Sequence, residues 1–372
     1  MEQVIKTFED CFVTDGYQRS ILIDTNRFTF FAIPKSLSSF INYIDGKTQN
    51  DIYLKYGYNN ADIIKEYFKF LYDNELIIEV DEILFDRFKP ISLFWETPYF
   101  VTNIIIDFSD VLDINNILSS VKIMLCPNIE IRIQTFFQLE RLLKLLDLLD
   151  DSLVGEIHLI FSDKQFNTIK MFPFDKYIRI ESILVYSCDT KKNDLKNKFI
   201  KTSNLSLNEL ILIKEINKFT PNLQLFIESQ SYNTYFNRKM YIGKNGEIKN
   251  APECVKSFGH VQNLNSPKDL ISIVNNLEFQ EYWKVKKEIC DVCKDCEFRH
   301  MCVDNRLPYQ RKSDNLWYHN TECNYNPYIA KWKGEEGYRT LNECGVVSNE
   351  KGFSIDHERI AAINEELWGG DE

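Results

Sequence analysis

The sequence lacks several features that would point to common functions. Its 44 lysine and arginine residues are outnumbered by 55 aspartate and glutamate residues, which gives a net charge of −11. The chain therefore has no overall basic surface for nucleic acid or an anionic membrane. No apolar run is long enough for a transmembrane helix, and the first ten residues have neither the basic start nor the apolar core of a signal peptide. Neither glycine-rich nucleotide loop, G-x-G-x-x-G or G-x4-G-K-[ST], is present. We therefore expect a cytoplasmic protein that binds neither nucleic acid nor membrane.

Composition predicts folded cores. Hydrophobic residues make up 44% of the 372 positions and aromatic residues 14%, which is ample for more than one domain. The pattern predicts an α/β protein with four regions: an N-terminal module over 1–88, an alternating α/β region over 99–235, a cysteine-rich domain over 236–347, and an acidic tail over 348–372 with a short helix over 357–367.

The cysteines are strongly clustered. Five of the ten lie in a single C-terminal segment, with the spacing C-x2-C-x2-C-x5-C and then one more after twenty residues: Cys290, Cys293, Cys296, Cys302 and Cys323. Thiolates two residues apart on a tight turn can face one centre, and further thiolates from nearby loops complete a tetrahedral shell. In a reducing compartment such clusters indicate metal or redox chemistry rather than disulfides or buried apolar thiols. The segment therefore predicts a metal or iron–sulfur site.

The N-terminal module has a winged-helix-like pattern. A β-hairpin is expected from runs 19–24 and 28–33, followed by helices over 36–43, 48–56 and 60–73 and a wing strand over 75–80. The third helix carries an apolar stripe at helical spacing, formed by Ile64, Tyr67, Phe68 and Leu71. Its acidic residues Glu66 and Asp73 disfavour DNA binding. The exposed hairpin edge favours capture of a peptide as an added strand.

This pattern resembles the peptide-recognition domains of ribosomal-peptide modification systems, which share the fold of the pyrroloquinoline-quinone peptide chaperone. The resemblance lies particularly in the helix end from Tyr43 to Gly46, followed by Thr48. It implies a precursor peptide as partner.

The region from 99 to 235 alternates between strands and helices. Strands are expected over 99–108, 129–133, 156–161, 177–186 and 223–227, and helices over 111–121, 138–149 and 206–217. This alternation predicts a mostly parallel sheet that forms a partial barrel. Cys126 and Cys188 have no partner at ligand spacing and are expected to be isolated thiols.

The region after 236 begins with a hairpin over 240–254, turning at Asn245 and Gly246, and a helix over 267–276. With the cysteines that follow, it resembles the SPASM domain of radical peptide maturases. Cys293, Cys296, Cys302 and Cys323 match the set that holds an auxiliary four-iron four-sulfur cluster there. Arg306 stands where the family's other auxiliary site has a cysteine, and Cys290 is additional to the pattern.

The resemblance also exposes an absence. Radical S-adenosylmethionine barrels carry C-x3-C-x2-C in the loop after their first strand, but residues 107–113 contain no cysteine. The middle region therefore resembles a degenerate radical-SAM-like barrel. The whole chain resembles the SPASM protein of "grasp-with-spasm" systems that make graspetide-type peptides. This implies a role beside a precursor peptide and an ATP-grasp ligase, without independent catalysis.

Several alternatives stay open. The cofactor is expected to be a four-iron four-sulfur cluster or, alternatively, zinc, since four thiolates suit both. Cys290 is either a further metal ligand or a bystander. Arg299 and Arg306 are candidate hydrogen-bond donors to the centre, and His260 and His300 are weaker ligand candidates. The competing functions are a radical S-adenosylmethionine enzyme with an unusual cluster and a winged-helix metal-sensing regulator.

Overall fold

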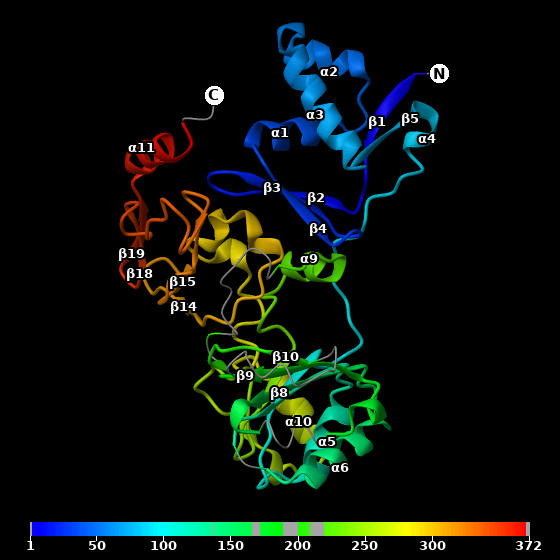
Figure 1. Cartoon of the computed structure of the whole chain (residues 1–372), viewed down its shortest axis with the longest axis vertical. Coiled ribbons are helices and arrows are strands. Elements are labelled where there is room, and N and C mark those ends of the chain that lie inside the picture. The colour runs from blue at the N-terminus through cyan, green and yellow to red at the C-terminus, as the bar shows by residue number, and fades with distance from the viewer. Residues whose placement is uncertain are drawn as a thin grey trace.

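The computed structural model describes residues 2–135, 137–165, 172–188, 200–207, 209 and 219–369. The N-terminal module lies at one end of an elongated molecule and a large β-sheet at the other, with the cysteine-containing segments between and beside them (Figure 1). Within these residues, no helix combines the length and apolar character needed to cross a membrane.

The N-terminal module contains the predicted hairpin and three helices. The hairpin strands β3 and β4 pair in antiparallel register, and β2 extends them to a three-stranded sheet. The predicted wing strand is β5, which pairs with β1 rather than with the hairpin. The bounds are β1 (Gln3–Thr7), β2 (Cys11–Asp15), β3 (Ser20–Asp24), β4 (Thr29–Ile33), α1 (Lys35–Ile44), α2 (Gln49–Tyr56), α3 (Ala61–Asp73), β5 (Ile77–Asp81) and α4 (Glu82–Phe85).

Local sequence explains these helices. Thr48 caps α2 through a reciprocal capping box, in which its side chain bonds the backbone N–H of Asp51 and the Asp51 carboxylate bonds the Thr48 N–H. The α3 stripe buries Ile64, Phe68 and Leu71 in the core of the module. The module therefore has a conventional hydrophobic core built from helices and strands.

The large sheet has eight strands in the order β10-β9-β8-β7-β6-β11-β12-β13, and it is open among the described residues. The first six strands are parallel, as the alternating pattern predicts, whereas β12 and β13 are antiparallel. The bounds are β6 (Asn103–Asp107), β7 (Asn128–Ile133), β8 (Glu156–Ser162), β9 (Ile180–Tyr186), β10 (Ile200–Thr202), β11 (Lys239–Ile242), β12 (Glu247–Lys249) and β13 (Gly259–His260).

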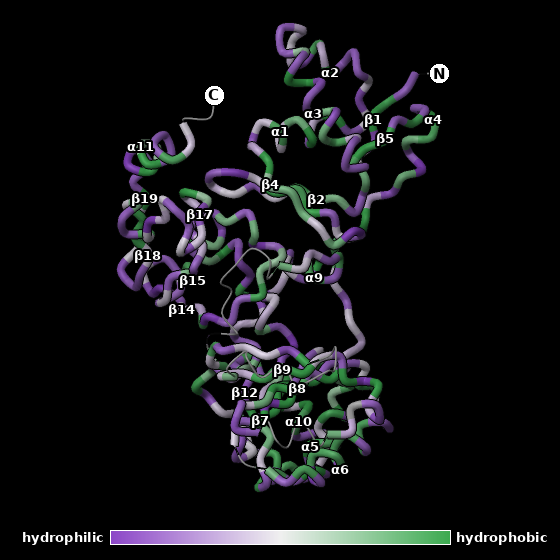
Figure 2. The backbone as a smooth tube through the Cα atoms, in the orientation of Figure 1, coloured by the Kyte–Doolittle hydropathy of each residue, from purple (hydrophilic) through white to green (hydrophobic). Residues whose placement is uncertain are grey.

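Helices cover one face of this sheet. Residues of α5 (Ile114–Ile123), α6 (Leu139–Leu149) and α10 (Pro267–Val274) pack with alternate strand residues in the largest hydrophobic cluster. Figure 2 shows the sheet and these helices largely in the hydrophobic colour. The other face carries polar groups such as Glu130 and Arg132, which form an ion pair. The expected hairpin strand β11 joins the sheet directly beside β6.

One predicted strand is wrong, and one predicted helix cannot be placed. Residues 223–227 belong to a helix, α9 (Leu223–Ser229), because the Asn222 side chain accepts a hydrogen bond from the Leu225 N–H and caps it. The helix expected over 206–217 lies largely outside the described residues.

The cysteine region, defined as residues 287–346, contains no described element longer than four residues. It consists of short 3₁₀ turns and two- to four-residue strands: η6 (Lys287–Ile289), η7 (Cys293–Asp295), η8 (Glu297–His300), β14 (Pro308–Gln310), β15 (Trp317–His319), β16 (Tyr325–Asn326), β17 (Lys331–Trp332) and the start of β18 (Val346–Asn349). After β19 (Gly352–Ile355), the predicted tail helix is confirmed as α11 (His357–Trp368), and it packs on its own chain through Ile360 and Ile363.

Candidate metal centre

Consecutive 3₁₀ turns position three of the predicted ligands. Cys293 opens η7, Cys296 separates η7 from η8, and Cys302 follows η8 after one intervening residue. Cys323 belongs to a later segment of the chain and lies two positions before β16. Such tight turns bend the backbone every few residues, so side chains close in sequence can converge on one side. None of these four cysteines is in a disulfide.

The four thiols are electrostatic neighbours. The pKa of Cys296 is raised well above its usual range by burial, by Glu297, and by the thiols of Cys302, Cys293 and Cys323. Burial likewise raises the pKa of Cys302, with contributions from Cys323 and Cys293. The geometry agrees, because Cys296, Cys302 and Cys323 pack against one hydrophobic cluster and Cys293 lines a cavity together with Cys323.

Their spacing is wider than a single ion requires. Among the described residues, one group of three possible metal ligands has all its ligand atoms within 4.8 Å of one another. It consists of Cys293, Asp304 and His319. A tetrahedral zinc ion with bonds of about 2.3 Å to sulfur holds its sulfurs about 3.8 Å apart. Among the described residues, no three of the four thiols lie within 4.8 Å of one another.

Buried charge supports the fit of an anionic metal–thiolate group. Lys287 Nζ lies 2.8 Å from Asp304 Oδ2, and Arg306 binds the same oxygen at 2.7 Å. Lys287 and Asp304 are buried, and Arg306 is nearly so, so two cations share one carboxylate. Uncompensated buried charge is costly. Arg306 also donates to the Cys293 sulfur at 3.8 Å, in agreement with its expected role. Metal-bound thiolates would neutralise the surplus positive charge.

Cys290 differs from the other four cysteines. It is fully buried, and burial raises the pKa of its thiol to about 12. Its backbone is bridged to Trp317 of β15, which ties the start of the cysteine region to the β14–β15 pair. Whether it binds metal stays a prediction.

His319 is a candidate that sequence reasoning missed. Its Nδ1–H donates to the Leu307 carbonyl at 3.1 Å, which leaves Nε2 with no hydrogen-bond partner among the described residues. The side chain is buried, and together with Cys293, Cys323 and Arg306 it lines a cavity of about 150 Å³. It lies four positions before Cys323, so the local spacing H-x3-C could have identified it.

The histidines and the second arginine that the sequence suggested lie elsewhere. His300 packs against Phe226 and is within hydrogen-bond distance of Ser229. His260 contacts the Asn245 carbonyl at the β11–β12 turn. Arg299 donates to backbone carbonyls of Asp15 and Cys296 rather than to a thiol.

The segment after β6, where the sequence has no cysteine, holds hydrogen-bonded carboxylates. Asp107, at the end of β6, accepts a hydrogen bond of 2.6 Å from the Tyr241 hydroxyl. Asp110 accepts one from the Gln138 N–H. Both therefore have structural partners.

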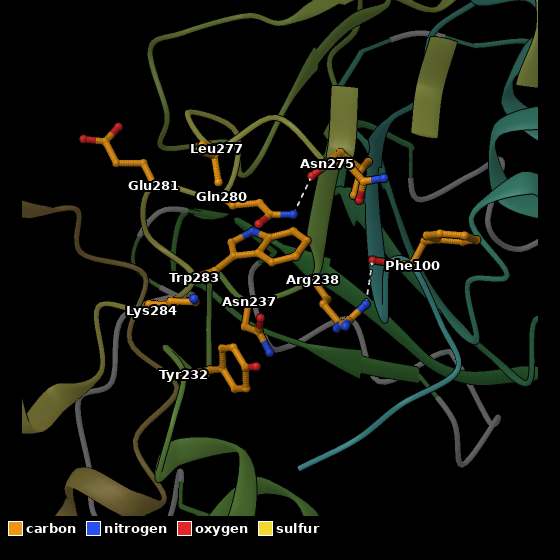
Figure 3. Close-up of a pocket in the computed structure, with 11 residues that line it drawn as sticks. Phe100, Tyr232, Asn237, Arg238, Asn275, Leu277, Gln280, Glu281, Trp283 and Lys284 are labelled. Carbon is orange, nitrogen blue, oxygen red and sulfur yellow. Dashed lines mark hydrogen bonds between the residues drawn. The ribbon is translucent and has the colours of Figure 1, made fainter. Parts of the chain in front are cut away.

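Another described cavity is separate from the cysteines. It has a volume of about 350 Å³ and lies where β6 and β11 begin, next to α10 (Figure 3). Trp283 lines the cavity and lies in the middle of the labelled side chains in Figure 3. The Arg238 guanidinium donates to the Phe100 carbonyl. No cysteine lines it.

The N-terminal module presents an open sheet edge. Among the described residues, β4 is an end strand of its sheet. Phe31 of β4 contacts Phe70 of α3 edge to face, with ring centroids 5.6 Å apart. Tyr67 and the half-exposed Ile63 continue the same side of α3 at spacings of three to seven residues. A free strand edge therefore lies beside an aromatic helix face.

Comparisons with known proteins are sparse. No protein-family model matches the sequence, and no curated protein matches it. Among solved structures, Streptococcus suis SuiB bound to S-adenosylmethionine is similar, with a TM-score of 0.29 and 13% identity over 81% of this chain and 95% of that chain. SuiB bound to its precursor peptide SuiA gives 0.29 and 12% over 81% and 95%. At these TM-scores the likeness establishes neither a shared fold nor a shared function.

Proposed function

We propose that this protein takes part in the maturation of a ribosomally made peptide. In this proposal it captures the leader of a precursor peptide on its N-terminal module and holds a metal centre in its cysteine region. The observation that carries the proposal is that Cys296, Cys302 and Cys323 pack against one cluster, and Cys293 shares a cavity with Cys323, beside two buried cations that share one carboxylate. The SPASM-type spacing of those cysteines supports the link to peptide maturation.

The centre is a four-iron four-sulfur cluster ligated by these four cysteines, with zinc as the alternative. Four thiolates suit either centre, and the SPASM-type spacing of these cysteines supports the cluster. When bound, the cluster would cross-link the loops and provide a site for electron transfer. Arg306 would donate to the Cys293 thiolate, and Lys287 would hold Asp304 in place beside it.

The precursor peptide adds as a strand to the free edge of β4. Backbone hydrogen bonds would give affinity, and the α3 face formed by Ile63, Tyr67 and Phe70 would select side chains. The open eight-stranded sheet acts as a scaffold, as a degenerate and partial radical-SAM-like barrel would. The partner that carries out the crosslinking chemistry is an ATP-grasp ligase.

Peptide binding can be tested by fluorescence anisotropy with labelled peptides encoded by short reading frames that adjoin the gene. Ile63→Glu should weaken binding at least tenfold, because it places a charge on the α3 face beside the free edge of β4. Leu54→Glu is the matched control, since Leu54 is an equally large, exposed residue on α2. The proposal fails if no such peptide binds, or if both variants weaken binding equally.

A further inference from the structure

The turn between β2 and β3 of the N-terminal module contacts residues 295–299 of the cysteine region, which are called the cysteine loop below. The Tyr17 N–H donates to the Asp295 carbonyl at 2.7 Å, and Arg299 donates to the Asp15 carbonyl at 2.6 Å. These two bonds flank Cys296 on the chain. The module therefore bonds the backbone before one proposed ligand and the side chain of Arg299 after it.

A buried ion pair strengthens this contact. Glu297, the residue after Cys296, is fully buried, and Arg19 of the module binds its Oε1 at 2.7 Å. The Tyr325 hydroxyl donates to the same oxygen at 2.5 Å and also receives a hydrogen bond from Arg19. Tyr325 follows Cys323 by two residues. One arginine thus links the segments that carry Cys296 and Cys323.

The fit at this turn leaves no room for a side chain at Gly16. A Cβ atom there would lie 2.7 Å from Glu297 Oε2 and 2.8 Å from the Glu297 nitrogen. Since real Cβ atoms do not approach that closely, any larger residue would push the cysteine loop away from the turn.

The two parts also share a hydrophobic core. Ile21 and Ile23 of β3 pack in one cluster with Phe298 and Trp332, and three of the cysteines pack against it: Cys296, Cys302 and Cys323. Phe30 of β4 adds an edge-to-face contact with Phe298. The module therefore supplies part of the hydrophobic cluster against which three of the thiols pack.

We propose that Arg19 and Gly16 of the N-terminal module are positioning residues of the metal centre, so that docking of the module closes the cysteine loops around the bound metal. The inference rests on the proposed centre and deepens it. Retention of metal then depends on a region that supplies no ligand. The peptide captured at β4 is held in a fixed relation to the centre, because β3 belongs to both the peptide-binding sheet and the shared core.

The test measures loss of metal from the full-length protein, purified anaerobically and placed in excess EDTA. Metal remaining on the protein is measured at intervals after desalting. Arg19→Ala and Gly16→Ala should each release metal at least tenfold faster than the unaltered protein, because both loosen the loop around Cys296. Leader-peptide anisotropy, measured in parallel, should stay within about threefold, since neither residue lies on the β4 edge.

Arg27→Ala is the matched control. Arg27 lies at the other end of β3, where it pairs with a buried carboxylate, Asp24, at 2.8 Å, as Arg19 pairs with Glu297. This variant should release metal at the rate of the unaltered protein. If Arg19→Ala fails to fold, Glu297→Gln replaces it, because it keeps the side-chain shape and removes the charge that Arg19 neutralises.

The outcomes separate the two proposals. If the unaltered protein holds no metal, the proposed function fails. If it holds metal, and the Gly16 variant and either the Arg19 or the Glu297 variant release it at the unaltered rate, only the positioning role of the module fails. Equal acceleration by Arg27→Ala would also overturn it, because the effect would then reflect general destabilisation of the module.

Discussion

The N-terminal module and the cysteine region are held together by different interactions. In the module, helices and strands bury a continuous set of aliphatic and aromatic side chains. In the cysteine region, no described element exceeds four residues, and buried charges such as Lys287, Asp304 and Arg306 lie among the thiols. Regular structure satisfies its own backbone, whereas short turns depend on side chains or a bound metal to hold them. The module should therefore be stable by itself, and the cysteine region should depend on its metal.

Removal of metal should have the largest effect. A structural metal site contributes on the order of 10 kcal/mol to folding, so its loss should unfold most of residues 287–346 locally. Hydrogen exchange should show lost protection there while α1, α3 and the strands of the large sheet stay protected. Unchanged protection in a sample shown to be free of metal would mean that the cysteine region folds without it.

A mutation that creates a cavity in the core of the N-terminal module should have a smaller effect, and that effect should be confined to the module. Phe68 is buried between Phe40 and Tyr72, so Phe68→Ala should lower the free energy of unfolding of α1–α3 by about 3–5 kcal/mol. Exchange of α3 amides measures this, and the loss should be the same with and without metal. A loss that appears only in the metal-free protein would show that the two regions do not differ as described.

Removal of a helix cap should have the smallest effect. Thr48→Ala breaks the capping box of α2 and should cost about 1 kcal/mol, measured as a lower denaturation midpoint of the module. Lys55→Ala, near the end of the same helix, is the control and should change stability by less than about 0.5 kcal/mol. A large effect of the control would mean that α2 is held by surface contacts rather than by its cap.

The same contrast explains how much the sequence could predict. The periodic stripe of Ile64, Phe68 and Leu71 specifies α3, because a helical period of buried residues is a local signal. The short apolar run at 223–227 fits a strand or a helix equally well, and the Asn222 cap decided it. The strands β1 and β2 were not predicted, although they are as long as the predicted strands β3 and β4.

At the site, sequence spacing identified the cysteines but not their surroundings. Cys293, Cys296 and Cys302 follow one another within ten residues, so their spacing is visible in the chain. His319 and Lys287 lie within six positions of Cys323 and Cys293, whereas Arg19 and the rest of the N-terminal module approach the cysteines through the fold, from almost 300 residues away. Such distant partners leave no pattern in a single sequence.

The most direct test of the account is iron and acid-labile sulfide analysis of the full-length protein purified anaerobically, with Cys302→Ser and Cys254→Ser alongside. The account predicts about four irons and four sulfides per chain, lost in Cys302→Ser and kept in Cys254→Ser, whose cysteine lies in a separate hydrophobic cluster. Zinc in place of iron, lost in the same variant, would keep the centre and change its identity. A protein that holds no metal, or one whose metal survives Cys302→Ser, would contradict the account.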